Sequence, residues 1–150
     1  MGTVFTATDD VTGGQVAVEV LNDEHLGNKE IRERFQQEAD ILRTLTHPEI
    51  CAVLNTADGQ GEVPYFVMPL LNGKSLASRV RGADEVPIGT TIHIIGRVLE
   101  ALAFSHRCGV LHRDIKPSNV FVCDAASERP EVKLLDFGIS KFASCSKSIV

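Results

Sequence analysis

The chain opens with two short runs of apolar and β-branched residues. Residues 3–8 and 15–21 predict two strands, because such residues favour the pleated surface of a sheet. Asp and Gly between them supply turn geometry, so a hairpin is expected. A stripe spaced four, three, four and three residues follows and predicts an amphipathic helix, which ends near His47 because Pro48 comes next. Its members are Ile31, Phe35, Glu38, Leu42 and Leu45.

Two further strands are predicted at residues 50–54 and 65–68, separated by a segment rich in turn-forming residues. Together with the hairpin they make a small antiparallel sheet with one helix. After Gly73 the pattern becomes helical, and Gly109 is placed to end the long helix. The residues expected on one face of that helix are Ile88, Ile92, Ile95, Leu99, Leu102 and Ala103.

This order of elements predicts an α+β fold with two lobes, a small antiparallel β lobe with one helix and then a mainly helical lobe. We expect the first lobe at residues 1–68, a hinge at 69–73 and the second lobe at 74–150. The hinge is too short to be a free linker, so the lobes should face each other across a cleft, where ligands usually bind.

Composition narrows the classes of function. The chain of 150 residues is 43% hydrophobic with a net charge of −5, which argues against a nucleic-acid partner. The apolar stretch at residues 92–102 is interrupted by His93, Gly96, Arg97 and Glu100, so we expect no membrane contact. The four cysteines form no C-x-x-C pair and no signal segment is visible, which favours the reducing cytoplasm.

The strongest chemical signal lies in the second half of the chain. Residues 112–119 read H-R-D-I-K-P-S-N and residues 136–138 read D-F-G. This pair of motifs resembles the catalytic loop and metal-binding triplet of protein kinases. Lys116 within the loop is similar to the serine/threonine branch of that family. The resemblance implies transfer of the ATP γ-phosphate to Ser or Thr hydroxyls of a protein substrate.

The resemblance also implies roles for single residues. Asp114 would accept the proton of the substrate hydroxyl, Lys116 would steady the transferring phosphate, and Asn119 and Asp136 would hold Mg²⁺. Arg113 resembles the arginine that pairs with a phosphorylated activation segment. Candidate phosphorylation sites are Ser144, Ser146 and Ser148.

The first lobe carries the features expected of an ATP site. Residues 2–5 resemble the end of the glycine-rich loop that covers the phosphates, beginning at Gly2, and the first strand and two further glycines would then be missing. Residues 16–21 resemble the third strand, normally V-A-x-K. By this resemblance Val4, Ala17 and Phe121 sandwich adenine, Met68 is the gatekeeper, and Pro69 and Leu71 lie in the hinge.

Position 19 departs from the family pattern. Glu19 stands where the family has a lysine that grips the phosphates and pairs with the helix glutamate, here Glu38. The separation between the two residues, 38 − 19 = 19, is the usual one, so only the residue type differs. A carboxylate here repels both Glu38 and the phosphates, and removing one electrostatic stabiliser typically costs ~10² to 10³ in rate. The remote candidates for a substitute lysine are Lys29 and Lys133.

The second half ends with a predicted hairpin of residues 120–122 and 132–135, whose tip is residues 124–130. Because the chain ends at Val150, we expect the second lobe to be incomplete and its long helix to leave an apolar face exposed. The function predicted is a serine/threonine protein kinase using ATP and Mg²⁺, weakened by Glu19. Two alternatives stay open, namely a non-catalytic pseudokinase module that binds a nucleotide or a protein partner, and a fragment with no function of its own.

Overall fold

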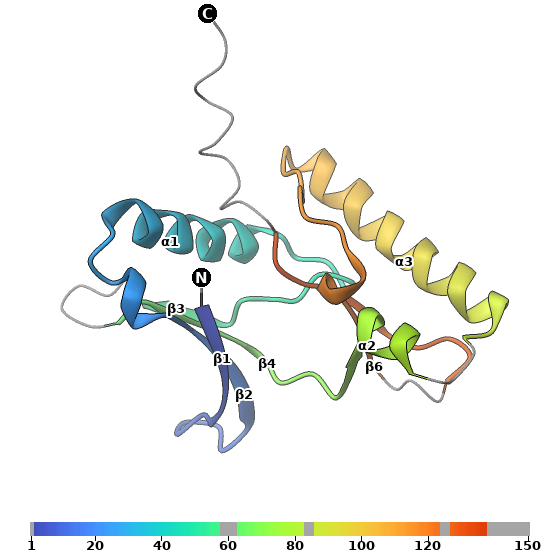
Figure 1. Cartoon of the computed structure of the whole chain (residues 1–150), viewed down its shortest axis with the longest axis horizontal. Coiled ribbons are helices and arrows are strands. Elements are labelled where there is room, and N and C mark those ends of the chain that lie inside the picture. The colour runs from blue at the N-terminus through green and yellow to red at the C-terminus, as the bar shows by residue number, and fades with distance from the viewer. Residues whose placement is uncertain (1, 58–62, 83–85, 124–126, 138–150) are drawn as a thin grey trace, which may run out of the picture. The chain divides into compact units, whose positions relative to one another are not determined.

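The computed structural model describes residues 2–57, 63–82, 86–123 and 127–137 (Figure 1). These residues form two compact units. The first contains residues 2–44 and 52–70, and the second contains Leu45–Cys51 together with Leu71–Phe137. The division at residues 68 and 73 stays a prediction.

The first unit is a four-stranded antiparallel sheet with one long helix. The sheet has the order β1-β2-β4-β3, and the predicted hairpin of β1 and β2 is confirmed. In the turn that joins the two strands of this hairpin, the Asp9 carboxylate accepts a hydrogen bond from Val11 N at 2.9 Å. Gly13 in the same turn adopts a φ of 70°, which favours glycine. The elements are β1 Gly2–Thr8, β2 Gln15–Leu21, the 3₁₀ turn η1 Asp23–His25, α1 Lys29–Thr44, β3 Asn55–Ala57 and β4 Tyr65–Pro69.

Helix α1 confirms the helix predicted from the stripe and begins two residues earlier. The side chain of Asn28 caps its start, accepting a hydrogen bond from Ile31 N at 3.2 Å. The helix buries one face against the sheet, where Phe35 and Phe66 rings lie 5.1 Å apart and Leu21 completes the core. The buried residues of α1 are Phe35, Glu38, Ala39 and Leu42.

The strand predicted at residues 50–54 is wrong, because β3 lies at Asn55–Ala57. Ile50 and Cys51 are buried in the second unit instead. There Ile50 makes a single parallel bridge to Leu134, and Cys51 N donates to Leu134 O at 3.1 Å. Their apolar character therefore reflects burial against the second unit's sheet and not membership of the first sheet.

The second unit is a three-stranded antiparallel sheet with helices. Its strand order is β5-β6-β7, and the predicted hairpin of β6 and β7 is confirmed. Ser75 caps α2 by accepting a hydrogen bond from Ser78 N at 3.2 Å. Residues 124–126 of the predicted hairpin tip lie outside the described residues. The elements are β5 Gly73–Ser75, α2 Leu76–Arg81, α3 Ile88–Arg107, the 3₁₀ turn η2 Pro117–Asn119, β6 Val120–Cys123 and β7 Val132–Leu134.

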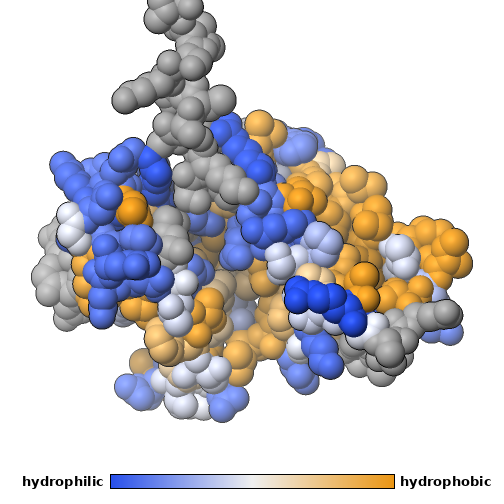
Figure 2. Space-filling view, viewed as in Figure 1, coloured by the Kyte–Doolittle hydropathy of each residue, from blue (hydrophilic) through white to orange (hydrophobic). Residues whose placement is uncertain are grey.

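Helix α3 confirms the long predicted helix, but the face that it buries differs from the predicted one. Most of the predicted stripe is exposed, including Ile88 at 81% and Ile92 at 67%. Small and β-branched side chains form the buried face because they allow close packing, and hydrophobic residues gather on the outside of α3 (Figure 2). The predicted exposed apolar face is thus present. The buried residues are Thr90, Ile94, Val98, Ala101 and Ser105.

The ends and composition of α3 bear on two other expectations. Gly109 has a φ of 76° and follows the last turn of α3, which confirms it as the residue that ends the helix.

By length and composition α3 is apolar enough to cross a membrane, with a mean hydropathy of 1.2, contrary to the sequence-based expectation that this stretch falls short. Core helices of soluble proteins pass the same test, so the match is weak evidence for a membrane span.

Candidate active site

The loop between α3 and η2 is held by a buried histidine. His112 is 1% exposed, and its Nε2 donates a hydrogen bond to Leu135 O at 2.9 Å. Its Nδ1 accepts a hydrogen bond from Asp114 N at 3.4 Å. The ring also stacks on Phe137, with centroids 4.4 Å apart. One neutral tautomer satisfies both nitrogens, so His112 joins residue 114 to residues 135–137.

Burial keeps this histidine neutral. Loss of solvent lowers the pKa of His112 below its ordinary value, and this effect outweighs the hydrogen bond to Leu135 and the nearby carboxylates, which act in the opposite direction. The sequence predicted no role for His112 beyond its place in the motif. The signal that could have indicated its burial is a histidine among the charged residues of this loop. Burial gives both nitrogens of its ring a fixed hydrogen-bond partner.

Three residues of the same loop meet at one carboxylate. Lys116 Nζ lies 2.7 Å from Asp114 Oδ2, and the side-chain amide of Asn119 donates to the same oxygen at 3.3 Å. The Asn119 amide also donates to the backbone oxygen of Asp114 at 3.0 Å. The structure therefore brings together Asp114, Lys116 and Asn119, all of which the sequence predicted to be catalytic.

Asp136 belongs to the same electrostatic cluster. Loss of solvent raises its pKa, the charge of Lys116 and the nearby His112 ring oppose that rise, and the negative charge of Asp114 adds to it. Asp136 and Arg113 are the non-glycine residues with positive φ in the described ranges, at 49° and 63°. Such strained backbone costs ~1 to 3 kcal/mol per residue and clusters at functional sites.

The oxygen atoms of this cluster fit a magnesium ion. The Asn119 amide nitrogen is directed to Asp114, its oxygen Oδ1 accepts a hydrogen bond from Ser118 Oγ at 3.4 Å, and Asp136 supplies a carboxylate. Mg²⁺ prefers oxygen ligands and usually takes one or two from protein and the rest from phosphates and water. Within the described ranges no group of three or more His, Cys, Asp or Glu forms an all-protein metal cage. The donor set thus fits a metal that is shared with a nucleotide.

In the first unit the strand register places Glu19 on the face of the sheet that α1 covers. Glu19 pairs with Phe66 of β4, which is buried in the α1 core, and directly paired residues share a face. A Cβ built on Gly2 would lie 2.6 Å from Glu19 Oε1, so the Glu19 carboxylate lies directly beside Gly2. Glu38 is buried on α1, at 9% exposure. Glu19 and Glu38 therefore belong to the same side of the sheet.

The predicted adenine residues divide between the two units. Val4 pairs with Glu19, and Ala17 pairs with Met68, so these residues share the α1 side of the sheet. Pro69 ends β4 opposite Val16. In the second unit Phe121 of β6 pairs with Lys133, and Leu71 precedes β5. Each set belongs to its own unit, and the assignment of both sets to adenine stays a prediction.

The substitute lysines are engaged elsewhere. Lys29 is 90% exposed and lies 3.6 Å from Glu33 on its own helix. Lys133 donates to Pro48 O at 2.5 Å and lies 2.7 Å from Glu131. The contacts described for these two lysines are therefore with protein groups, and none of them supports a role in holding phosphate. Gly138 and the candidate phosphorylation sites Ser144, Ser146 and Ser148 lie outside the described residues.

Comparison with known proteins gives one consistent family. The model of the protein kinase domain matches residues 1–149. The serine/threonine-protein kinase PknA of Mycobacterium tuberculosis is 34% identical over 145 residues, which are 94% of this chain and 33% of that protein. The probable serine/threonine-protein kinase CE0033 of Corynebacterium efficiens is 36% identical over 151 residues, covering 99% of this chain and 22% of that protein.

Solved structures agree with these relatives. The crystal structure of the PknI kinase domain of M. tuberculosis matches with a TM-score of 0.74 at 29% identity, covering 94% of this chain and 55% of that one. Residues 1–466 of Rad53 in complex with AMP-PNP match with a TM-score of 0.71 at 28% identity, covering 92% and 35%. This chain thus spans only a third of PknA and about half of the PknI domain. It belongs to the protein kinase family, and the relatives that it matches are serine/threonine kinases.

Proposed function

We propose that this chain provides the nucleotide site and catalytic loop of a serine/threonine protein kinase that transfers the ATP γ-phosphate to protein hydroxyls. The observation that supports it most is the contact of Lys116 Nζ and the Asn119 amide with the Asp114 carboxylate. A carboxylate fixed in this way can accept the proton of a substrate hydroxyl, while the neighbouring ammonium can steady the transferred phosphate.

The free thiols of Cys51, Cys108 and Cys123 support a cytoplasmic location.

The predicted cofactors are ATP and Mg²⁺. Asn119 Oδ1 and the Asp136 carboxylate would hold the metal, which neutralises charge on the phosphates when it is bound. The pKa of Asp136 is raised by burial and by Asp114, and a cation beside it would relieve both effects. By the family pattern, Val4 and Ala17 of the first unit and Phe121 of the second would supply apolar surface to the nucleotide base, and Met68, Pro69 and Leu71 would take the gatekeeper and hinge positions.

Glu19 opposes this activity within the same site. Its carboxylate faces the α1 side of the sheet beside Gly2, where the family pattern requires a cation for the phosphates. We therefore expect weak ATP binding and slow transfer rather than an altered reaction. The substrate hydroxyl and the metal ligands do not depend on residue 19, so the order of chemical steps is retained.

Two measurements on the full protein test this proposal. Calorimetry with Mg-ATP measures binding, and transfer of labelled γ-phosphate to a mixed Ser/Thr protein substrate measures catalysis. The matched variants Asp114→Asn and Asp10→Asn make the same chemical change in the catalytic loop and in the exposed hairpin turn. We expect the parent protein and the Asp10→Asn variant to transfer phosphate. We expect Asp114→Asn to abolish this transfer. Binding without any transfer would favour a nucleotide-binding pseudokinase, and the absence of both would overturn the proposal.

A further inference from the structure

A cavity of about 610 Å³ lies in the second unit, between the first turns of α3 and the connection that joins β6 to β7. Its walls come from residues 87–93 and from residues 128 and 129, and none of them belongs to the catalytic loop. Cavities that hold small molecules usually measure ~300 to 1,000 Å³. This cavity is therefore large enough for a small organic ligand.

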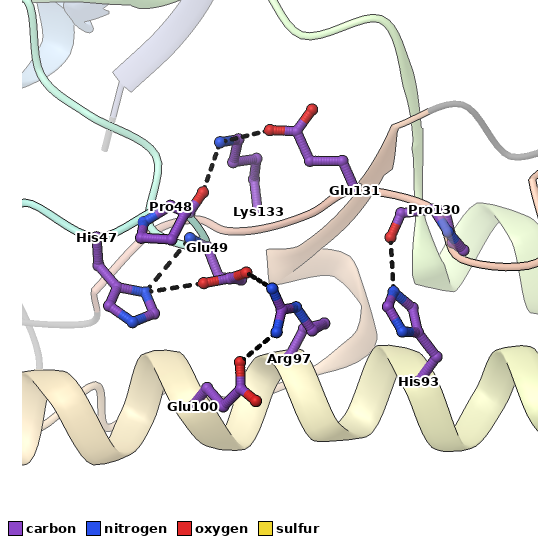
Figure 3. Close-up of polar contacts among 9 residues, drawn as sticks. All are labelled: His47, Pro48, Glu49, His93, Arg97, Glu100, Pro130, Glu131 and Lys133. Atoms are coloured by element: carbon purple, nitrogen blue, oxygen red, sulfur yellow. Dashed lines mark hydrogen bonds and ion pairs between the residues drawn. The ribbon is translucent and has the colours of Figure 1, made fainter.

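A hydrogen bond ties the two walls of the cavity together. His93 of α3 donates through Nε2 to Pro130 O at 3.0 Å (Figure 3). Pro130 is fully buried and directly follows the two residues of the connection that line the cavity. The contact therefore holds Glu128 and Arg129 beside the first turns of α3.

The start of α3 brings backbone donors to the cavity. Pro87 precedes the helix and offers no side-chain cap, and the first turn carries no acidic residue. Gly89 and Thr90 line the cavity, and their amides donate to no oxygen atom of the described residues. The positive end of this helix of 20 residues therefore meets the cavity without a protein anion in its own first turn.

A buried hydroxyl borders the same space. Thr90 is 4% exposed, and its hydroxyl makes no hydrogen bond with any described residue, whereas the neighbouring Thr91 Oγ1 donates to Pro87 O at 3.2 Å. The Thr90 oxygen is not among the fully enclosed side-chain atoms that lack a partner, so it keeps access to the cavity that Thr90 lines. Buried polar groups are normally hydrogen-bonded, and a ligand oxygen in the cavity would supply the missing partner.

Charged and apolar side chains complete the lining. Arg129 is exposed, and within the described ranges its guanidinium makes no ion pair. The Glu128 carboxylate only accepts hydrogen bonds, so it suits a hydroxyl of a ligand and not an anionic group. Pro87 and Ile92 add apolar surface, and Ile92 is 67% exposed. The cavity thus combines donors for an anion with contacts for the organic group that carries it.

We propose that this cavity binds a small organic phosphate ester, whose phosphate contacts the amides of Gly89 and Thr90, the Thr90 hydroxyl and the Arg129 guanidinium. A phosphate accepts several hydrogen bonds at once, and helix N-termini and arginine are suited to it. Glu128 accepts a hydrogen bond from a hydroxyl of the ester, and Ile92 contacts its carbon chain. The site lies outside the catalytic loop, and its ligand binds whether or not the protein transfers phosphate.

Amide NMR titration of the full protein tests this site directly. The probes are glycerol 3-phosphate, inorganic phosphate as the anion without an organic group, and glycerate as a related carboxylate. We expect glycerol 3-phosphate to shift the Gly89 and Thr90 amides in a saturable way and to bind at least about tenfold more tightly than the other two. Equal affinity for inorganic phosphate or for glycerate would overturn the assignment to a phosphate ester.

The same spectra separate this cavity from the candidate active site. The amides of Asp114 and Asn119 report on the catalytic loop, and they should not shift with glycerol 3-phosphate. Saturable shifts at these two amides without shifts at Gly89 would place the probe in the active site and overturn the proposal. Loss of the proposed kinase activity would leave the expected shifts at Gly89 and Thr90 unchanged.

Matched variants assign the contacts. Arg129→Gln removes a charged donor and should weaken glycerol 3-phosphate at least about tenfold, whereas Arg107→Gln, at an exposed position at the other end of α3, should not. Thr90→Val keeps the shape of the side chain and should weaken binding about three- to tenfold, with Thr91→Val as its control. Because Arg129 is exposed, its variant stays informative even if Thr90→Val does not fold. Equal affinities for Arg129→Gln and Arg107→Gln would overturn the proposal.

Discussion

Nε2 of His112 donates a hydrogen bond to the backbone oxygen of Leu135 at 2.9 Å, across 23 residues of sequence. This bond ties the loop that carries Asp114 to the segment that carries Asp136. The two acidic residues reach one electrostatic cluster because a neutral, buried imidazole bridges their backbones. Changes at His112 should therefore affect stability as well as the geometry of the site.

The first prediction concerns the pH dependence of stability. Burial lowers the pKa of His112, so the unfolded chain binds a proton more readily than the folded one, and stability should fall as the pH falls below about 6.5. His112→Gln should be less stable by ~1 to 3 kcal/mol at pH 7.5, because it loses one of two hydrogen bonds and the packing on Phe137. Its denaturant midpoint should depend less on pH below 6.5.

The control for this measurement is His106→Gln, at an exposed position of α3. It should keep the pH profile of the parent protein. Equal slopes for all three proteins between pH 6.5 and 5 would show that His112 is not the group that links protonation to folding.

The second prediction concerns Asp136, the expected metal ligand, and the free energy that its ionised carboxylate costs the folded protein. Because burial and Asp114 raise the pKa of Asp136, the ionised carboxylate opposes folding, and this penalty grows as the pH rises from about 3.8 through the folded-state pKa. Asp136→Asn should therefore unfold at an equal or higher temperature than the parent at pH 7, with the difference vanishing near pH 3.5. Binding of Mg-nucleotide should be lost in the same variant. A variant that is less stable at pH 7 and equally affected at low pH would contradict this account.

The third prediction compares two glycines in the second unit. A Cβ at Gly73 would lie 2.2 Å from Val122 O, so Gly73→Ala must separate β5 from β6 and should destabilise by ~1 to 3 kcal/mol. At Gly96, inside α3, a Cβ would meet no described atom within 4 Å apart from its chain neighbours and the nearby backbone of the helix itself. Gly96→Ala should stabilise by ~0.5 to 1 kcal/mol through its helix propensity.

Thermal unfolding of the two alanine variants checks the signs. The expected shifts are opposite, with a rise of ~1 to 4 °C for Gly96→Ala. A fall for Gly96→Ala would indicate that this face of α3 is covered in the full protein, and an unchanged midpoint for Gly73→Ala would show that the β5–β6 pairing can relax.

Sequence patterns predicted the local elements and the catalytic loop but not the path of the chain between units. The hairpin of β1 and β2 follows from turn residues, and α1 follows from its periodicity, because both depend on neighbours in sequence. The destination of Ile50 and the buried face of α3 depend on packing with distant residues such as Leu134, which periodicity does not encode. A continuous apolar surface around α3 left the buried face undetermined.

The candidate site shows the same division. The resemblance to kinase motifs pointed to Asp114, Asn119 and Asp136, and the structure adds the contacts that His112 and Lys116 make with this part of the chain.

The final prediction tests the residue that departs from the family pattern. Glu19 lies on the α1 side of the sheet beside Gly2, and Glu38 is buried on the helix that covers this side. Glu19→Lys should give Glu38 an oppositely charged partner and give the phosphates a cation. In the full protein, Mg-ATP affinity should rise, and phosphoryl transfer should rise by ~10² or more.

Two further variants make the outcome specific to the site. Glu24→Lys makes the same charge change at a side chain that is 73% exposed, and it should leave both binding and transfer unchanged. Asp136→Ala in the Glu19→Lys background should abolish the gain, because without that carboxylate the new lysine has no correctly held phosphate to contact. If Glu19→Lys changed neither ATP binding nor turnover, residue 19 would not face the phosphates, and a binding module that uses its surface rather than catalysis would become the better account of this chain.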